Sequence, residues 1–182
     1  MSAALAALRT EGARALVIDL RRCPGGALTA AIEVTELFLE NDRRIVSTRG
    51  RARNQNMSFS AHPPRHTRAL AEPLAVLVDE GTASGCEIIG AALQEWQRAQ
   101  LVGTRTSGLT TIQTILPLAN GAALRLTTAR WFTPKGRSLE GEGLVPDAEV
   151  ALDEAAARSL GDPLHDAQLR RAVDIVDASS PR

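Results

Sequence analysis

Hydrophobic and polar positions follow two different periods along this chain of 182 residues. Short apolar runs rich in β-branched residues predict buried strands, and runs with an apolar residue at every third or fourth position predict helices. The strands predicted in this way are Ala15–Leu20, Arg43–Arg51, Leu74–Asp79 and Ala99–Gly103. The predicted helices are Leu5–Glu11, Ala27–Glu40, a segment that opens near Ser84 and runs to Gln94, and Asp162–Val176. Because strands and helices alternate, the pattern predicts a layered α/β fold.

The pattern changes in the second half of the chain. Two β-prone runs within Thr111–Phe132 flank the dipeptide Asn120-Gly121, which is a strong signal for a β-hairpin. The segment Gly143–Val150 is predicted to close the sheet region. Earlier in the chain, Asn54–Arg68 is polar and holds two prolines, which predicts a loop.

Composition and charge exclude several functional classes. Apolar residues make up 44% of the chain and charged residues 23%, which is typical of a globular domain. The formal net charge is zero, so nothing indicates binding to nucleic acid or to an anionic membrane surface. The arginines near the second strand have one neighbouring aromatic, Phe59, and are interpreted as a solvated edge hairpin; they are Arg43, Arg44, Arg49, Arg51 and Arg53. No apolar run has the length of a membrane span.

The beginning of the chain is interpreted as an amphipathic helix that runs into a strand. Arg9 and Glu11 interrupt its apolar pattern, and it lacks the basic region of a signal peptide. The cellular location stays open. No metal or cofactor motif is found, so neither is expected.

Ser84 is the first candidate for chemistry. It lies in a small-residue turn between the apolar run Leu74–Asp79 and a predicted helix. This arrangement exposes the hydroxyl next to helix N-terminal amides, as in a serine nucleophile. Taken alone, a serine at a strand–helix junction is more often a helix N-cap than a nucleophile.

Three longer runs together resemble the carboxyl-terminal processing proteases, also called tail-specific proteases. They are Ala15–Leu39, Leu74–Gln94 and Leu101–Val150, and their motifs occur in the family's order. The resemblance implies an α/β fold with a ClpP/crotonase-like core and a C-terminal β-hairpin region. It implies a serine endopeptidase that acts on the C-termini of polypeptides.

The same resemblance assigns roles at the site. Ser84 falls on the catalytic serine, and the N–H of Gly85 falls on one donor of the oxyanion hole. The second donor falls in the turn that contains Gly25 and Gly26. Glycine suits such a turn because it lets the backbone approach a developing oxyanion without a side chain in the way.

The chain departs from the family at the general base. Family members activate the serine with a lysine, and a glutamine four residues later positions that lysine. Here the glutamine is Gln113, but the lysine position holds Leu109, which cannot accept a proton. The only lysine of the chain, Lys135, falls in a different turn of the family. The resemblance therefore predicts impaired turnover. Without its lysine, Gln113 is equally interpreted as a solvent-facing strand residue.

A second departure concerns domain organisation. Family members carry a PDZ domain ahead of the region matched here, and residues 1–14 have no room for one. The expectation is a single protease-like domain over residues 1–182, with a truncated relative and a shortened sequence both left open.

The resemblance also brings Cys23 and Cys86 near one site. The default interpretation of Cys86 is a small, buried core residue that points away from Ser84. A disulfide between the two cysteines is the minority alternative, which requires Cα atoms within roughly 7 Å.

Three functional hypotheses remain from the sequence. The first is a serine endopeptidase of the C-terminal processing type with low activity. The second is a catalytically inactive relative that binds peptides or forms homo-oligomers. The third, a crotonase-like acyl-CoA enzyme, is weaker because no CoA-binding feature is evident.

Overall fold

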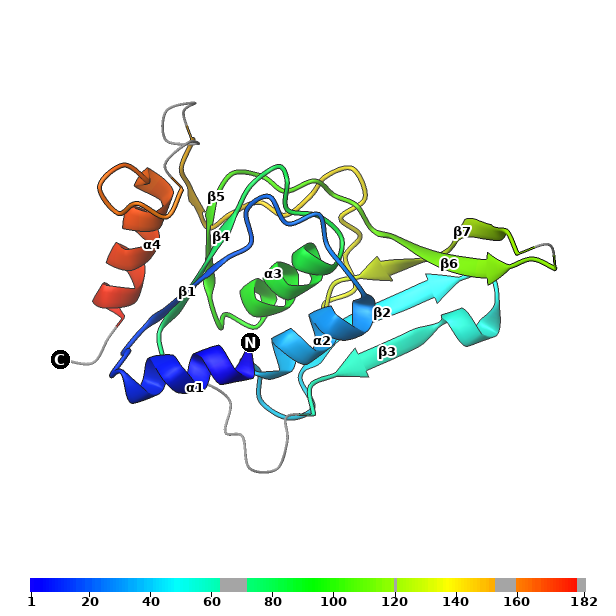
Figure 1. Ribbon diagram of the computed structural model, residues 1–182, viewed down its shortest axis with the longest axis horizontal. Coiled ribbons are helices and arrows are strands. Elements are labelled where there is room, and N and C mark those ends of the chain that lie inside the picture. The colour runs from blue at the N-terminus through cyan, green and yellow to red at the C-terminus, as the bar shows by residue number, and fades with distance from the viewer. Residues whose placement is uncertain (63–71, 120, 153–159, 180–182) are drawn as a thin grey trace.

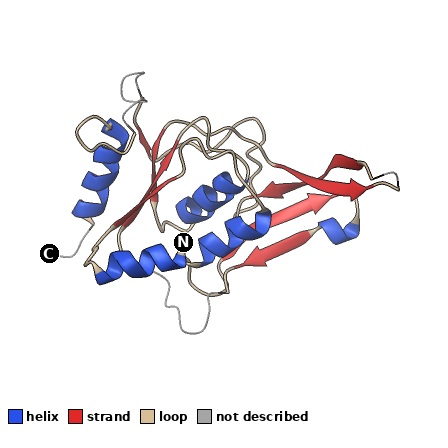
Figure 2. Cartoon of the chain, in the orientation of Figure 1, coloured by secondary structure: helices blue, strands red, loops and turns tan. Residues whose placement is uncertain are grey.

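The computed structural model describes residues 1–62, 72–119, 121–152 and 160–179. It contains two four-stranded sheets, one parallel and one antiparallel, with helices packed around them (Figures 1 and 2). The strands of the parallel sheet, in spatial order, are β1 (Leu16–Asp19), β4 (Leu74–Val78), β5 (Gln100–Gly103) and β8 (Ala148–Glu149). The antiparallel sheet consists of β3 (Met57–Ser60), β2 (Arg44–Gly50), β7 (Ala123–Phe132) and β6 (Thr111–Pro117). The helices are α1 (Ser2–Thr10), α2 (Leu28–Glu36), the 3-10 helix η1 (Arg53–Gln55), α3 (Gly85–Glu95) and α4 (Ala167–Ala178).

The α/β architecture expected from the sequence is confirmed. Strand β4 is buried along its whole length because its two faces pack into different clusters. Leu74, Val76 and Val78 join the main core around α3, whereas Ala75 and Leu77 pack beneath α4. Helix α3 lies between the two sheets and α4 covers the opposite face of the parallel sheet (Figure 1).

The loop predicted for Asn54–Arg68 is corrected in part. Met57–Ser60 forms strand β3, which pairs antiparallel with β2 across a register irregularity near Arg44. Met57 and Phe59 alternate with Ser58 and Ser60, as in a strand, but the run is only four residues long, and Phe59 is its one large residue packed on the core. So short a run does not stand out in the polar segment, and its pairing with β2 is what identifies it as a strand. Pro63 and Pro64 lie outside the described residues.

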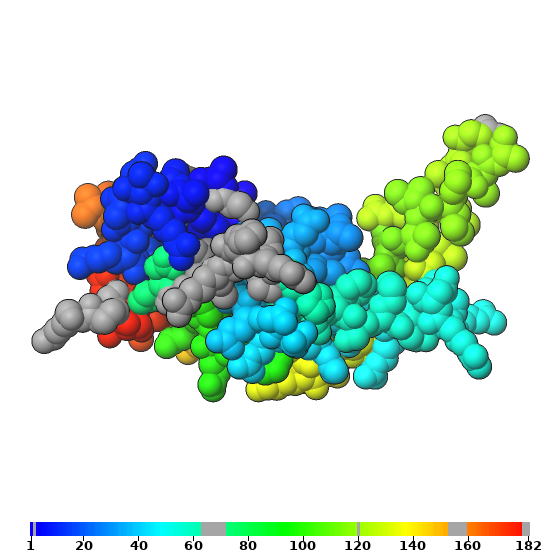
Figure 3. All heavy atoms as spheres, turned by 90° about the horizontal axis from the view of Figure 1, so that it is seen from below, coloured from blue at the N-terminus to red at the C-terminus, as the bar shows by residue number. Residues whose placement is uncertain are grey.

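The hairpin predicted for Thr111–Phe132 is confirmed. Strands β6 and β7 pair antiparallel from Thr111–Arg130 to Pro117–Ala123. Gly121 has φ +80°, the left-handed conformation that the tight turn requires, and Asn120 lies outside the described residues. The distal part of the hairpin extends away from the body as an arm (Figure 3). Its exposed apolar side chains are Ile115, Leu116, Leu118, Leu124 and Leu126.

A buried ion pair attaches α4 to the parallel sheet. The Arg21 guanidinium donates to Asp166 Oδ2 at 2.8 Å, and both side chains are almost completely buried. Asp166 also caps α4 by accepting from the Leu169 N–H at 3.0 Å. Burial by itself raises the pKa of the Asp166 carboxyl, but the hydrogen bond from Arg21 and those from the Gly161 and Leu169 N–H groups outweigh it and lower the pKa to about 2.

This ion pair predicts a loss of stability in acid. The folded-state pKa lies below the value of about 3.9 for an unfolded aspartate, so the stabilisation is present above that value and is lost as the pH falls through about 2. We expect the free energy of unfolding of the unmodified chain to exceed that of Asp166→Asn by about 2 kcal/mol near pH 6. The difference should shrink toward pH 2 in urea unfolding monitored by circular dichroism. A difference that is independent of pH would contradict the assignment.

Candidate active site

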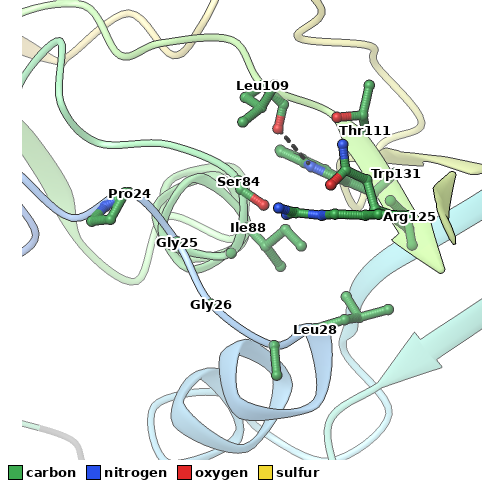
Figure 4. Close-up of a pocket in the computed structure, with 14 residues that line it drawn as sticks. Pro24, Gly25, Gly26, Leu28, Ser84, Ile88, Leu109, Thr111, Arg125 and Trp131 are labelled. Atoms are coloured by element: carbon green, nitrogen blue, oxygen red, sulfur yellow. Dashed lines mark hydrogen bonds between the residues drawn. The ribbon is translucent and has the colours of Figure 1, made fainter. Parts of the chain in front are cut away.

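The turn that carries Ser84 joins the parallel sheet to helix α3. Strand β4 ends at Val78 and α3 begins at Gly85, with Ser84 at φ +51°, a conformation that non-glycine residues rarely adopt. The Thr82 hydroxyl helps to hold this turn by donating to the Leu20 carbonyl at 2.8 Å. Ser84 is half-buried and lines a pocket at the N-terminus of α3 (Figure 4).

The Gly25–Gly26 turn lies directly against Ser84. A Cβ placed on Gly25 would be 2.7 Å from the Ser84 Cβ and 3.0 Å from the Gly85 nitrogen. Gly25 also has φ +102°, so this position requires glycine for both its conformation and its close approach. Neither Gly26 nor Gly85 donates its N–H to another described residue. Two free backbone donors therefore lie beside the Ser84 hydroxyl.

Asp79 joins the two turns at this site. Its Oδ1 accepts from the Arg22 N–H at 2.8 Å and from the Gly81 N–H at 3.0 Å. The Ala83 N–H adds a bond of 2.9 Å to the Cys23 carbonyl. Because one carboxylate holds both turns, the geometry between Ser84 and the glycines does not depend on a flexible loop.

Cys86 is buried in the main core, as expected, but it is not a free thiol. Cys23 and Cys86 form a disulfide, with Cα atoms 6.3 Å apart. The physical reason is the contact just described: the turn after β1 lies over the start of α3, which brings the residue before Pro24 next to the residue after Gly85. We expect alkylation without reductant to leave the mass of the folded protein unchanged, and alkylation after reduction to add two groups. Two alkylated thiols without reductant would exclude the bond.

Leu109 and Gln113 line the same pocket as Ser84, Gly25, Gly26 and Gly85. Leu109 is 43% exposed, and its backbone is held on both sides while its side chain faces the pocket. Its N–H donates to Glu87 Oε2 at 2.9 Å, and its carbonyl accepts from Trp131 Nε1 at 3.2 Å (Figure 4). Gln113 lies on β6. The structure thus brings together all six residues that the resemblance names.

Glu87 is a residue of the site that the sequence analysis missed. It is fully buried and accepts four hydrogen bonds. One comes from the Ser84 N–H at 2.9 Å, and the others come from the Thr106 hydroxyl, the Gly108 N–H and the Leu109 N–H. Its spacing of three residues from Ser84 matches a capping box, a signal that could have found the first bond. The bonds to residues 106–109 required the tertiary structure.

Few side chains that line the pocket can ionise. Among its described lining residues, Arg125 is the only one with an ionisable side chain. Lys135 lines a different pocket together with Arg137 and Glu95. His62 lies near Asp42, His165 near Asp162, and His66 falls outside the described residues. No lysine, histidine or carboxylate of the described chain therefore lines the pocket of Ser84.

The described residues contain no group of three or more histidine, cysteine or acidic side chains arranged to hold a metal ion. They also contain no helix with the length and apolar character needed to span a bilayer.

Comparison with known proteins identifies the family. The model of peptidase family S41 matches residues 1–150. A carboxy-terminal-processing protease of Bartonella bacilliformis is 46% identical over 141 residues, which are 78% of this chain and 32% of that protein. A carboxyl-terminal-processing protease of Synechocystis is 38% identical over 173 residues, which are 95% of this chain and 39% of that protein. The chain thus spans between about a third and two fifths of these relatives' lengths.

Solved structures agree with this relationship. The photosystem II D1 C-terminal processing protease has a TM-score of 0.71 and 31% identity, over 81% of this chain and 37% of that one. A putative S41 protease from Bacteroides fragilis has a TM-score of 0.77 over 96% of this chain and 48% of that one; at 19% identity it shows the fold alone. The chain belongs to peptidase family S41, and its relatives are the carboxyl-terminal processing serine proteases.

Proposed function

We propose that Ser84 is the nucleophile of a serine-peptidase site of the C-terminal processing type, and that its turnover is low because Leu109 occupies the position of the general base. The observation that carries the proposal is the position of Ser84 beside two free backbone N–H groups, in a pocket whose described lining has no base. The relatives' names, which refer to carboxyl-terminal processing, support polypeptide C-termini as substrates.

Each part of the site has a role in this proposal. The Ser84 oxygen attacks the carbonyl carbon of a bound peptide, and the negative charge that develops on the carbonyl oxygen is stabilised by the N–H groups of Gly85 and of the Gly25–Gly26 turn. The hydroxyl proton then has to leave to water, because the described pocket residues include no acceptor for it. Loss of general-base assistance costs about 10²- to 10⁴-fold in rate.

A fluorophosphonate probe tests this proposal. The serine oxygen bonds to phosphorus, fluoride leaves and the proton goes to solvent, so the reaction requires no protonation of an amine leaving group. We expect slow labelling that adds one phosphonyl group at Ser84, and no labelling of Ser84→Ala. Peptide cleavage that persists in Ser84→Ala would contradict the proposal. Rapid peptide cleavage that Ser84→Ala abolishes would place a base outside the described pocket.

A second candidate is a catalytically inactive relative that binds peptides or forms homo-oligomers. The open pocket without a base favours peptide binding, and the exposed apolar side chains of the β6–β7 arm favour association. Peptide binding without any Ser84 adduct would select this candidate. Sedimentation velocity at several concentrations tests the association.

A further inference from the structure

Arg125 lies in the pocket of Ser84 although nothing in its sequence surroundings assigns it a role. It is on β7, opposite Ile115 of β6, and Gln113 pairs with Thr127 two positions along the ladder. Directly opposed residues of antiparallel strands project from the same face, so Arg125 and Gln113 share a face and are diagonal neighbours. Both line the pocket, and the Arg125 side chain extends from β7 toward Ser84 (Figure 4).

The charge of Arg125 is not neutralised by the described residues. Other arginines of the fold have carboxylate partners: Arg130 pairs with Glu140, and Arg137 pairs with Glu95. Arg125 makes no ion pair with a described carboxylate, and no acidic side chain lines its pocket. The pocket therefore presents one open guanidinium, which binds a carboxylate in bidentate fashion better than any other side chain.

Apart from Thr111 and Gln113, the other large side chains that line the pocket are apolar. Leu28 lies at the start of α2, Ile112 lies on β6, and both are partly exposed in the pocket along with Leu109. A ligand that fits this lining combines an apolar side chain with a negative group placed a short distance from the carbonyl beside Ser84.

We propose that Arg125 determines specificity by pairing with a carboxylate of the peptide bound next to Ser84. This inference rests on the proposed function, since it names the substrate class of the same pocket. The carboxylate has two sources with the same chemistry, the free C-terminus of the peptide and the side chain of a glutamate or aspartate close to the bond at Ser84.

Peptide binding measured by fluorescence anisotropy tests the inference. Three kinds of labelled peptide share one apolar sequence. The first ends in a free carboxylate and the second in an amide. The third also ends in an amide but carries one glutamate, placed in turn at each of its last three residues. We expect at least one carboxylate peptide to bind about tenfold more tightly than the neutral amide. The difference should decrease at high salt because the pair is open to solvent. Preference for the first peptide identifies the C-terminus as the source, and preference for the third identifies a side chain.

Variants separate the effect of Arg125 from that of net charge. Arg125→Gln should bring the three peptides to equal affinity, and Arg125→Lys should retain part of the preference. The matched control is Arg51→Gln, which removes the same charge from an exposed turn outside the pocket and should keep the whole preference. The inference is overturned if the three peptides bind equally to the unmodified chain, if none binds, if Arg125→Gln keeps the preference, or if Arg51→Gln removes it as well.

The fluorophosphonate adduct reports on the proposed function independently of these peptides. An adduct at Ser84 together with no preference for carboxylate peptides would overturn the role of Arg125 and leave the nucleophile in place. A preference that depends on Arg125, with no adduct at Ser84, would support the binding role and overturn the serine chemistry.

Discussion

Replacing Leu109 by lysine is expected to raise ester and peptide hydrolysis by about 10²- to 10⁴-fold, the usual contribution of a general base. The backbone of residue 109 is already held by Glu87 and by the Trp131 indole, and its side chain faces the same pocket as Ser84. A lysine can therefore enter without disturbing those bonds. The positive charge of Arg125 in the same pocket lowers the pKa of a lysine at this position, which favours the neutral amine that a base requires.

Rates of hydrolysis of a p-nitrophenyl ester and of a peptide, measured against pH, check this expectation. The Leu109→Lys rate should rise with pH through the pKa of the new amine. Leu109→Met is the matched control, since it keeps the size of the side chain without a base and should leave the rate unchanged. Ser84→Ala in the Leu109→Lys background should abolish the gain. A gain that survives Ser84→Ala, or an equal gain in Leu109→Met, would contradict the proposed roles.

Replacing Glu87 by glutamine is expected to lower the free energy of unfolding by about 2–4 kcal/mol. The glutamine keeps the volume of the side chain, but one of its two terminal atoms becomes a donor. That NH₂ group then faces N–H donors of Ser84 and Leu109 or of Gly108, so buried donors lose their acceptor. The change should also loosen the link between the Ser84 turn and residues 106–109.

Urea unfolding measures the loss of stability, and hydrolysis by the Leu109→Lys variant measures the effect on the site. Glu33→Gln is the control, because Glu33 is an exposed residue of α2 and does not line the pocket. The free energy of unfolding of this variant should differ from that of the unmodified chain by less than about 0.5 kcal/mol. If Glu87 positions Ser84 and residue 109, Glu87→Gln should reduce kcat of Leu109→Lys more than it changes KM. If Glu87→Gln and the unmodified chain have equal free energies of unfolding, the four hydrogen bonds of Glu87 make no net contribution to stability.

Local chemistry was sufficient to predict much of this molecule. The buried run Leu74–Val78, the small-residue turn at Ser84 and the helix after it were predicted from apolar periodicity and from the conformations that the turn residues allow. The β6–β7 hairpin was predicted from two β-prone runs around the dipeptide Asn120-Gly121, and the structure shows Gly121 with positive φ. The family's motif order then indicated that Ser84, the Gly25–Gly26 turn, Leu109 and Gln113 share a pocket, and the structure places all of them around one.

The features that the sequence did not predict all depend on contacts between distant segments. Strand β3 pairs with the edge of β2, and its own alternation of apolar and polar residues covers only four positions, too few to predict a strand within a polar segment. Glu87 looks like a local helix cap, yet three of its four bonds go to residues 106–109. The disulfide likewise follows from how the turns pack together, and so does the position of the Arg125 guanidinium in the pocket, where no described carboxylate pairs with it. By itself the sequence determined most of the helices and strands, because turn conformations and apolar periods are local, and the family's motif order predicted which residues lie at the site. Only the tertiary structure decided which buried polar groups, cysteines and charges meet, because those partners lie on segments separated along the chain.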